Sequence, residues 1–567
     1  MAGFSSRYMT MSTSPRSPQR LPHYVSLLQP FEGKKWNNDT QADYYNKMVS
    51  NQMGDFAIGK SSNPAMSARD KINRAPQALG LVSLKPTLRI TEPGKKIQNK
   101  YLFEDVLTRQ LLKYQLPSPL LPEREDNKGM FNIKPYLELL RLVYTVGDLS
   151  RSEFYAFGVT MTDYHDFDSV VEKIKAYRND AKKNHISARK HYHDYVMKYV
   201  EDLYSDKIDS NDVKVRENKG KSSKKFIKTK FNNVGDYGNA FLRYLTGTGL
   251  VVVNKRLQVV VSPNRNEDVE YILEHVDREA HSYSKEEYNN IIFNVESPRL
   301  LSDDEEKLIN KIKQLDARLS EFDVKTTDVY SNLSTLDLKK IQYEKENQLE
   351  SLARKQYAKS LKSYNTEEID DVVQTFQHIK SQDYFDNPLY LEWNTWRALT
   401  MIDNGNIKGS FKTNVNGDPI NTAPGNTADI IGDYGSFNMI CEVTMSSGKK
   451  QYEMENEPVA RHLGELRMKE NGKETFGLFV AKTIQPNVIT EFYYKHRIPT
   501  KLYGGTVEFI PLTIDDFTTF FKNVTQDGHK LNEEDIQKIH TKTKEFAESA
   551  DDETDWYNKI RRYVLSL

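Results

Sequence analysis

Two acidic residues in the last third of the chain lie in segments that predict neighbouring strands. Asp429 begins the run Asp429-Ile430-Ile431, and Glu442 lies within Ile440-Cys441-Glu442-Val443. Between them, Asp433-Tyr434-Gly435 is typical of a turn, so the two segments predict a hairpin. Such a hairpin brings the two carboxylates together, and buried carboxylates repel each other unless a cation lies between them. Mg²⁺ suits an all-oxygen site that keeps several waters. The pattern therefore predicts a metal-dependent phosphodiesterase.

Nearby residues offer further groups for such a site. Glu455, Val459 and His462 are spaced i, i+4 and i+7, which places a carboxylate and an imidazole on one face of a helix. Pro458 would either kink that helix or leave Glu455 in the loop before it. Glu392 lies among aromatic residues on a predicted helix over 387–402.

The predicted mechanism draws its ligands from several elements. A divalent ion would be held by Asp429, Glu442 and the carbonyl of Val443, and it would lower the pKa of a bound water. Glu455 and Glu392 would complete the shell or support a second ion. His462 would orient the water or steady a carboxylate. By pattern alone, a solvated helix face is the alternative for Glu455 and a structural role is the alternative for His462.

Composition limits the class of protein. The 567 residues suggest roughly three to four domains. Lys and Arg together number 80, as do Asp and Glu, so any nucleic-acid surface must be local. Cys441 is the single cysteine, which excludes an intramolecular disulfide and a cysteine-based zinc site and fits a reducing cytoplasm. The N-terminal residues lack a signal-peptide pattern, and no apolar run is long enough to span a membrane. We expect a cytoplasmic, bacterial protein.

The first half contains two similar patterns of a helix followed by a short hairpin. In the first, a helix begins near Ser67, strands are predicted at 80–84 and 88–91, and another helix opens at Glu92. In the second, a helix over 231–247 precedes strands at 249–253 and 257–261. This order of elements is that of a winged helix, a unit that contacts either DNA or other proteins.

A basic segment leads into the second pattern. Residues 213–230 hold eight basic side chains and one acid; the basic residues are Lys214, Arg216, Lys219, Lys221, Lys224, Lys225, Lys228 and Lys230. The segment fits either a solvated loop or a surface that follows DNA phosphates. Other basic residues are placed where a winged helix or its arm reaches a groove: Arg16, Arg69, Lys71, Arg74 and Arg243.

The expected architecture is multi-domain α+β. Residues 1–285 form a DNA-recognition region with winged-helix-like subdomains at about 1–145 and 146–285. Residues 286–365 form a helical linker, in which the segment 300–306 predicts a helix N-cap with acids in the first turn and a second helix covers 335–363. Residues 366–567 alternate helices and strands, which predicts a mixed sheet flanked by helices.

At these acidic residues the chain resembles the AlwI-type restriction endonucleases, a family that includes PleI, MlyI and the nicking enzyme BstNBI. The resemblance runs almost from end to end, and residues 454–462 are its most specific block. It is also carried by Ser14-Pro15-Arg16-Ser17-Pro18, Phe31-Glu32-Gly33, Arg89-Ile90-Thr91-Glu92, residues 244–250, Leu391-Glu392-Trp393, residues 423–426, Glu442-Val443-Thr444 and Ser447-Gly448.

The resemblance implies a type IIS enzyme, in which an N-terminal region recognises a short asymmetric site and a C-terminal domain cuts a few base pairs outside it. It implies a PD-(D/E)xK catalytic core and one or two Mg²⁺ ions. The family's acidic positions correspond to Glu392, Asp429, Glu442 and Glu455, with the carbonyl from Val443 and the family histidine at His462.

Two positions depart from the broader PD-(D/E)xK pattern. Thr444 replaces the expected lysine and Ala428 the expected proline. Because Thr444 supplies no positive charge, Glu455, a second metal ion, or Lys449 or Lys450 would have to compensate. The resembled family shares the threonine, so this departure does not count against the resemblance.

Three hypotheses stay open at this point. The first is an endonuclease that cuts both strands of duplex DNA through transient pairing of cleavage domains. The second is a nicking relative that lacks such pairing or needs a second subunit for it. The third is a DNA-binding protein with an inactive nuclease domain, against which the presence of all four acids argues.

Overall fold

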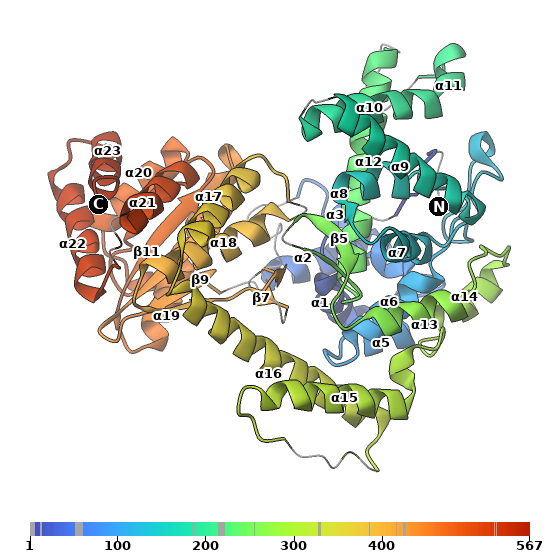
Figure 1. Ribbon diagram of the computed structural model, residues 1–567, viewed down its shortest axis with the longest axis horizontal. Helices are drawn as coiled ribbons and strands as arrows, with labels where there is room; N and C mark the ends of the chain where they lie inside the picture. Colours follow the sequence, from blue (N-terminus) through green and yellow to red (C-terminus); the bar gives the residue numbers. More distant parts are fainter. Residues whose placement is uncertain are drawn as a thin grey trace. The chain divides into compact units, whose positions relative to one another are not determined.

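The computed structural model describes residues 6–11, 14–51, 61–184, 187–213, 222–254, 256–326, 330, 332–384, 386–414, 417–422, 427–526, 528 and 530–567. The chain divides into two compact units, Met1–Lys345 and Glu346–Leu567, drawn in blue to green and in yellow to red in Figure 1. The boundary falls inside the predicted linker 286–365, within helix α16 (Thr335–Leu361). The three-part functional division of the chain stays a prediction.

The first unit is mainly helical. Its α-helices are α1 (Leu21–Ser26), α2 (Asn38–Ser50), α3 (Pro64–Ile72), α4 (Ala75–Ala78), α5 (Glu92–Lys96), α6 (Phe103–Lys113), α7 (Pro135–Val146), α8 (Arg151–Glu153), α9 (Phe167–Asn184), α10 (Ala188–Leu203), α11 (Ser205–Asp209), α12 (Ser223–Thr246), α13 (Asn266–His275), α14 (Lys285–Phe293) and α15 (Glu305–Ser320). Its strands are β1 (Val82–Ser83), β2 (Arg89–Ile90), β3 (Leu149–Ser150), β4 (Val251–Val253) and β5 (Gln258–Val261). A π-helical turn, η5 (Phe154–Gly158), follows α8.

Both helix-and-hairpin patterns form as predicted. β1 pairs antiparallel with β2 after α3 and α4, and α5 follows. β4 pairs antiparallel with β5 after α12, and β3 adds to the other side of β5. Helix α12 starts earlier than the predicted residue 231, because Ser222 caps its N-terminus by accepting a hydrogen bond from the Lys225 N–H. The order of elements is confirmed, whereas the winged-helix assignment stays a prediction.

The second unit contains the predicted mixed sheet. Its strands are β6 (Asn406–Gly409), β7 (Lys412–Thr413), β8 (Pro419–Asn421), β9 (Ile430–Asp433), β10 (Phe437–Thr444), β11 (Glu474–Ala481) and β12 (Phe509–Thr513). Its helices beyond α16 are α17 (Thr366–Lys380), α18 (Asn387–Ile402), α19 (Lys449–Lys469), α20 (Pro486–Arg497), α21 (Ile514–Gln526), α22 (Glu533–Ser549) and α23 (Glu553–Val564).

The described residues of this unit form a five-stranded sheet with the order β12-β11-β10-β9-β6. β10, β11 and β12 are parallel, while β9 runs antiparallel to both β10 and β6. The residues of β10 and β11 are almost all buried, as expected of strands covered on both faces. Helices α18 and α21 pack on the sheet, and so do α19 and α20.

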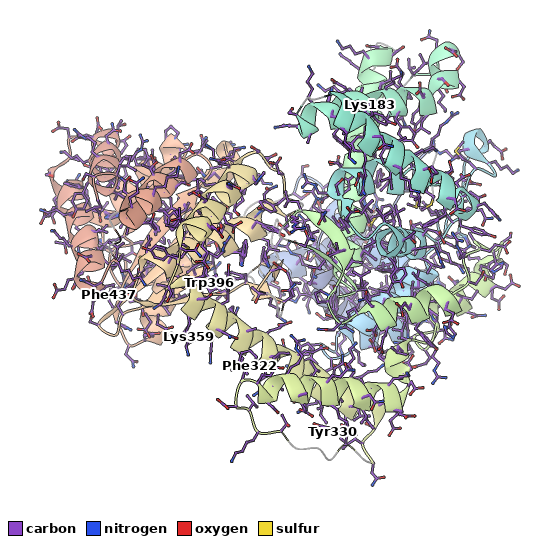
Figure 2. The ribbon with its side chains drawn as sticks, viewed as in Figure 1. Lys183, Phe322, Tyr330, Lys359, Trp396 and Phe437 are labelled. Atoms are coloured by element: carbon purple, nitrogen blue, oxygen red, sulfur yellow. The ribbon has the colours of Figure 1, made fainter. Side chains whose placement is uncertain are left out.

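Helix α18 is anchored to the edge of this sheet by an aromatic side chain. Every residue from Leu389 to Ile402 is buried. The indole N–H of Trp396, labelled in Figure 2, donates a 3.2 Å hydrogen bond to the carbonyl of Ile407 in β6. The helix that carries Glu392 is therefore held firmly against the sheet that carries Glu442.

Across the described ranges, no helix combines the length and the apolar character that a membrane span requires.

Candidate active site

The predicted hairpin is present and sets Asp429 against Glu442. The paired residues of the two strands run from Asn438 with Asp433 to Cys441 with Ile430. Continuing this register by one pair places Asp429 directly opposite Glu442, on the same side of the two strands. The Val443 N–H donates a 2.9 Å hydrogen bond to Asp429 Oδ2, which closes the open end of the strand pair.

The turn of the hairpin also forms as predicted. Gly435 has a φ of +80°, a conformation that favours glycine. Its N–H donates to Asp433 Oδ1 at 3.0 Å, which confirms Asp433 as a turn residue. This turn fixes the register and, with it, the pairing of the two acids.

The acidic side chains raise the pKa values of one another. Burial raises the pKa of Asp429 well above its usual range, and the nearby charge of Glu442 raises it further. Burial likewise raises the pKa of Glu442, with added contributions from the charges of Glu455 and Glu392. Both Glu392 and Glu442 are 6% exposed. Acids from β10, α18 and α19 and from the residue just before β9 therefore share one poorly solvated neighbourhood, where a positive charge would be strongly stabilised.

Helix α19 supplies Glu455 and His462, and it continues without interruption past Pro458. The interpretation that Pro458 leaves Glu455 in a preceding loop is therefore wrong. The helix starts nine residues before the proline, at Lys449, because the buried side chain of Gln451 fixes the connection from β10. Gln451 Nε2 donates to the carbonyls of Ser446 and Thr483.

Each of the two α19 side chains contacts a residue of β10. The Thr444 hydroxyl donates a 2.6 Å hydrogen bond to Glu455 Oε1. His462 Nδ1 lies 2.8 Å from Glu442 Oε1. Burial and the charge of Arg461 lower the pKa of His462, which favours the neutral imidazole. A structural role and an orienting role are both consistent with this contact.

Thr444 thus has a function that sequence reasoning missed. In the sequence it shows only as the replacement of an expected lysine, yet its hydroxyl positions Glu455. Of the two lysines named as substitutes, Lys450 lowers the pKa of Glu455 through its charge. Lys449 instead pairs at 3.3 Å with Glu453 on the exposed side of α19. Of these two lysines, the structure therefore favours Lys450 as the one whose charge acts on the acids.

The acids do not form a shell of three or more side chains around one point. Within the part of the chain that the structure describes, no group of at least three His, Cys, Asp or Glu side chains is arranged to hold a metal ion. The ligand set of four carboxylates therefore stays a prediction. The smaller set of Asp429, Glu442 and the Val443 carbonyl fits Mg²⁺, which is often bound by one or two carboxylates and keeps several waters.

Substitution of His462 tests its contact with Glu442. We expect His462→Ala to weaken the apparent affinity for Mg²⁺ in cleavage assays by about 10- to 100-fold, as loss of a partner that orients a ligand does. Activity should recover largely at saturating Mg²⁺. His378→Ala is a matched control, because His378 is an exposed histidine of α17 that pairs with Asp383. Loss of activity that no Mg²⁺ concentration restores would contradict an orienting role.

The predicted DNA-contact residues lie in the first unit on several elements. Lys224, Lys225 and Lys228 are exposed at the start of α12, and Arg243 lies in its last turn. Lys230 is different, because its Nζ lies 5.0 Å from the ring centroid of Tyr204 and it packs there as a cation–π contact. Residues 214–221 of the basic segment lie outside the described residues, as do residues 423–426 of the resemblance.

The remaining predicted contacts are also accessible. Arg69 and Arg74 are exposed, and Lys71 is half-buried on α3. Arg74 pairs with Asp70 at 3.2 Å. Arg16 is exposed, and its charge acts on the phenol of Tyr155, as does that of Arg243. The structure therefore brings Arg16 and Arg243 to one neighbourhood although 227 positions separate them in the sequence.

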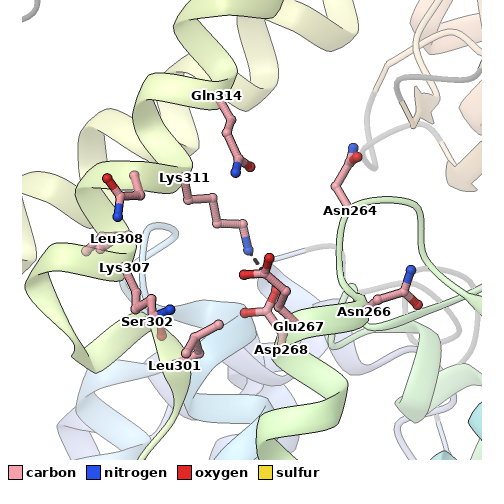
Figure 3. A pocket seen from close by; sticks show the side chains of 11 residues that line it. Asn264, Asn266, Glu267, Asp268, Leu301, Ser302, Lys307, Leu308, Lys311 and Gln314 are labelled. Atoms are coloured by element: carbon pink, nitrogen blue, oxygen red, sulfur yellow. Dashed lines mark hydrogen bonds and ion pairs between the residues drawn. The ribbon is translucent and has the colours of Figure 1, made fainter.

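A separate cleft of about 670 Å³ lies in the first unit, between α13, α15 and the turn at Leu301–Asp303 (Figure 3). Lys311 reaches across it and pairs with Asp268 at 2.8 Å. Its lining includes none of the predicted catalytic or DNA-contact residues. It is therefore distinct from the acidic site.

Comparison with protein families identifies the chain. A family model described as AlwI restriction endonuclease matches residues 77–520, which include α12, the hairpin and α19. The chain belongs to the AlwI restriction endonuclease family. As an AlwI-family member it is a nuclease that acts on DNA, which confirms the resemblance noted from its sequence.

Two solved structures are similar to parts of this AlwI-family chain. The small subunit (R.BspD6I2) of the heterodimeric restriction endonuclease R.BspD6I is 26% identical, with 34% of this chain and 98% of that chain covered and a TM-score of 0.30. The BpuJ1 endonuclease binding domain, in complex with pyrene- and phenanthrene-modified DNA, is 14% identical, with 48% and 91% covered and a TM-score of 0.32. At these TM-scores neither match defines the fold. No curated protein matches significantly.

Proposed function

We propose that this AlwI-family chain is a type IIS endonuclease that binds a short asymmetric site in duplex DNA and hydrolyses phosphodiesters a few base pairs outside it. The observation that carries the proposal is the pair Asp429 and Glu442, set opposite each other on buried strands with mutually raised pKa values. Two buried carboxylates side by side destabilise the folded state unless a cation binds between them.

The division of the chain supports cleavage at a distance from the recognised site. The predicted DNA-contact residues belong to the unit Met1–Lys345, whereas the acids belong to the unit Glu346–Leu567. Separate compact units allow one part to hold the recognised sequence while the other reaches a neighbouring phosphodiester. The PD-(D/E)xK assignment and the winged-helix assignment are part of this proposal.

Mg²⁺ is the cofactor that the acidic site fits. Asp429, Glu442 and the Val443 carbonyl would hold it, and when bound it would neutralise charge on the phosphate and lower the pKa of a water. The side chains of the protein have their own tasks. His462 holds Glu442 in one orientation, and Thr444 does the same for Glu455. Glu455 is then placed to accept a proton or to support a second ion.

The number of DNA strands that are cut determines which protein partners the enzyme needs. Double-strand cutting by one acidic site requires transient pairing of two cleavage units or a second cleavage subunit, whereas nicking requires neither. We expect duplex DNA as the substrate in both cases.

Cleavage of a supercoiled plasmid with Mg²⁺, followed by run-off sequencing, tests the proposal. Type IIS activity predicts cuts on one side of a single asymmetric sequence, at a fixed offset. Linear product indicates cutting of both strands, and open circles alone indicate the nicking alternative. Intact plasmid under all Mg²⁺ concentrations would instead support a DNA-binding protein with an inactive nuclease unit.

A further inference from the structure

Helix α12 carries a continuous polar stripe along its length. Its members are Lys224, Lys228, Asn232, Gly235, Asn239 and Arg243. Successive members lie three or four positions apart, which is the spacing of one helical face. The first three are exposed and the last three are half-buried. With 24 residues the helix is about 36 Å long, which is close to one turn of duplex DNA.

The lysines at the start of α12 are not explained by the stability of the helix. The N-terminal end of a helix carries partial positive charge, so lysines there are unfavourable. Lys224, Lys225 and Lys228 are nevertheless exposed in the first two turns. An anionic partner such as DNA phosphate would offset this repulsion.

Two glycines of α12 differ in what surrounds them. A Cβ at Gly238 would lie 2.5 Å from the Tyr155 ring, so packing against η5 requires glycine there. A Cβ at Gly235 would have no heavy atom within 4 Å. Glycine in a helix interior lowers the stability of the helix. No packing contact within the described structure explains why glycine stands at position 235. Gly235 leaves room for a partner to approach the helix backbone closely.

The second half of the stripe is a pre-oriented polar network. Asn239 Nδ2 donates to the Tyr155 hydroxyl at 3.1 Å, and Arg243 Nε donates to Asn239 Oδ1 at 2.9 Å. Tyr155 is buried in η5, and the Arg151 guanidinium lies 5.7 Å from its ring centroid. The amide and the guanidinium are thus held in place before any partner binds, which reduces the entropy cost of recognition.

The chemistry of this face selects duplex DNA over an apolar partner. The stripe has no large apolar member. Asp236 is the exposed acid beside it. A carboxylate repels phosphate but accepts a hydrogen bond from the cytosine amine, so it fits a position over bases rather than over the DNA backbone.

We infer that α12 is the sequence-reading helix of this enzyme, with Asn239 and Arg243 at base edges, Gly235 at the closest approach, and Lys224 and Lys228 on phosphates. Asn pairs with adenine and Arg with guanine in the major groove. This inference rests on the proposed function for its ligand, and it extends the DNA-contact assignment to Asn232, Gly235 and Asn239.

Selection from a randomised duplex library in Mg²⁺-free buffer, with the full-length chain, tests the inference. Asn239→Ala and Arg243→Ala should each relax the preference at one base position and lower affinity for the selected site by about 5- to 150-fold. The double variant Lys224→Ala/Lys228→Ala should weaken binding to every sequence and reduce the slope of log K against log salt by about 1.8. Lys538→Ala, an exposed lysine of α22, is the matched control and should change neither.

Gly235→Leu separates recognition from folding. Since the Cβ position is open, thermal stability should stay equal or rise, while affinity for the selected duplex falls by on the order of tenfold. Unchanged preference in Asn239→Ala and Arg243→Ala, together with unchanged affinity in Gly235→Leu, would overturn the inference while cleavage by the wild type still supports the proposed function. If the wild type bound no duplex at low salt, the proposed function would fail as well.

Discussion

Glu442→Gln is expected to remove nearly all DNA cleavage while leaving DNA binding intact. Glu442 lies opposite Asp429 and contacts His462, so the substitution removes one of two negative charges on which cation binding depends. Loss of such a group costs several kcal/mol of transition-state stabilisation, which is about 10³-fold in rate. Single-turnover cleavage of a plasmid and binding of a short duplex measure the two properties separately.

Glu453→Gln is the matched control for this experiment. Glu453 lies on α19 two positions before Glu455 and is exposed, and it pairs with Lys449 rather than with the acids. Its removal should change cleavage less than about twofold, as exposed ion pairs contribute little. Cleavage by Glu442→Gln at near wild-type rates would show that the acidic pair is not the catalytic centre.

The second large effect concerns stability and pH. The pKa values of Asp429 and Glu442 are raised in the folded chain, so the folded state binds protons more tightly than the unfolded state. The contribution of these two carboxyls to stability in Mg²⁺-free buffer is then fully present below the ordinary carboxyl pKa of about 4, and it is lost as pH rises through their raised pKa values. Glu442→Gln removes one of these groups and relieves the repulsion on the other. We expect it to stabilise the Mg²⁺-free protein at pH 7 to 8 by about 1–3 kcal/mol, or roughly 3–9 °C.

Thermal unfolding at several pH values, with and without Mg²⁺, measures this effect. The melting temperature of the variant should exceed that of the wild type at pH 8 without Mg²⁺, and the difference should shrink toward pH 5. Mg²⁺ should raise the melting temperature of the wild type more than that of the variant. A variant that is less stable than the wild type at pH 8 would mean that Glu442 is a structural ion-pair partner instead.

Most elements of the second unit were predictable because local pattern and tertiary environment agree there. The helix over 387–402 was predicted at its observed bounds, since a Pro follows its start and apolar residues cover all its faces. Pro511 is tolerated inside β12 because β12 is an edge strand. β6 was not predicted, because Asn406–Gly409 is short and polar and is a strand only by pairing with β9.

The candidate site was predictable in its members but not in their contacts. Asp429 and Glu442 follow from two strand-like segments and the turn between them, all of which are local features. The bond from Thr444 to Glu455 and the contact of His462 with Glu442 depend on how α19 packs over β10, which no local pattern encodes. For the same reason the sequence left open whether Pro458 lies inside the helix or at its start, and the structure places it inside α19.

The measurement that tests the central claim most directly is the location of a bound cation. Crystals grown with Mn²⁺ in place of Mg²⁺ reveal the ion by its anomalous scattering. The account predicts a peak at about 2.1 Å from oxygens of Asp429 and Glu442 and from the Val443 carbonyl. A cleavage-competent protein whose peaks all lie away from these three residues would contradict it.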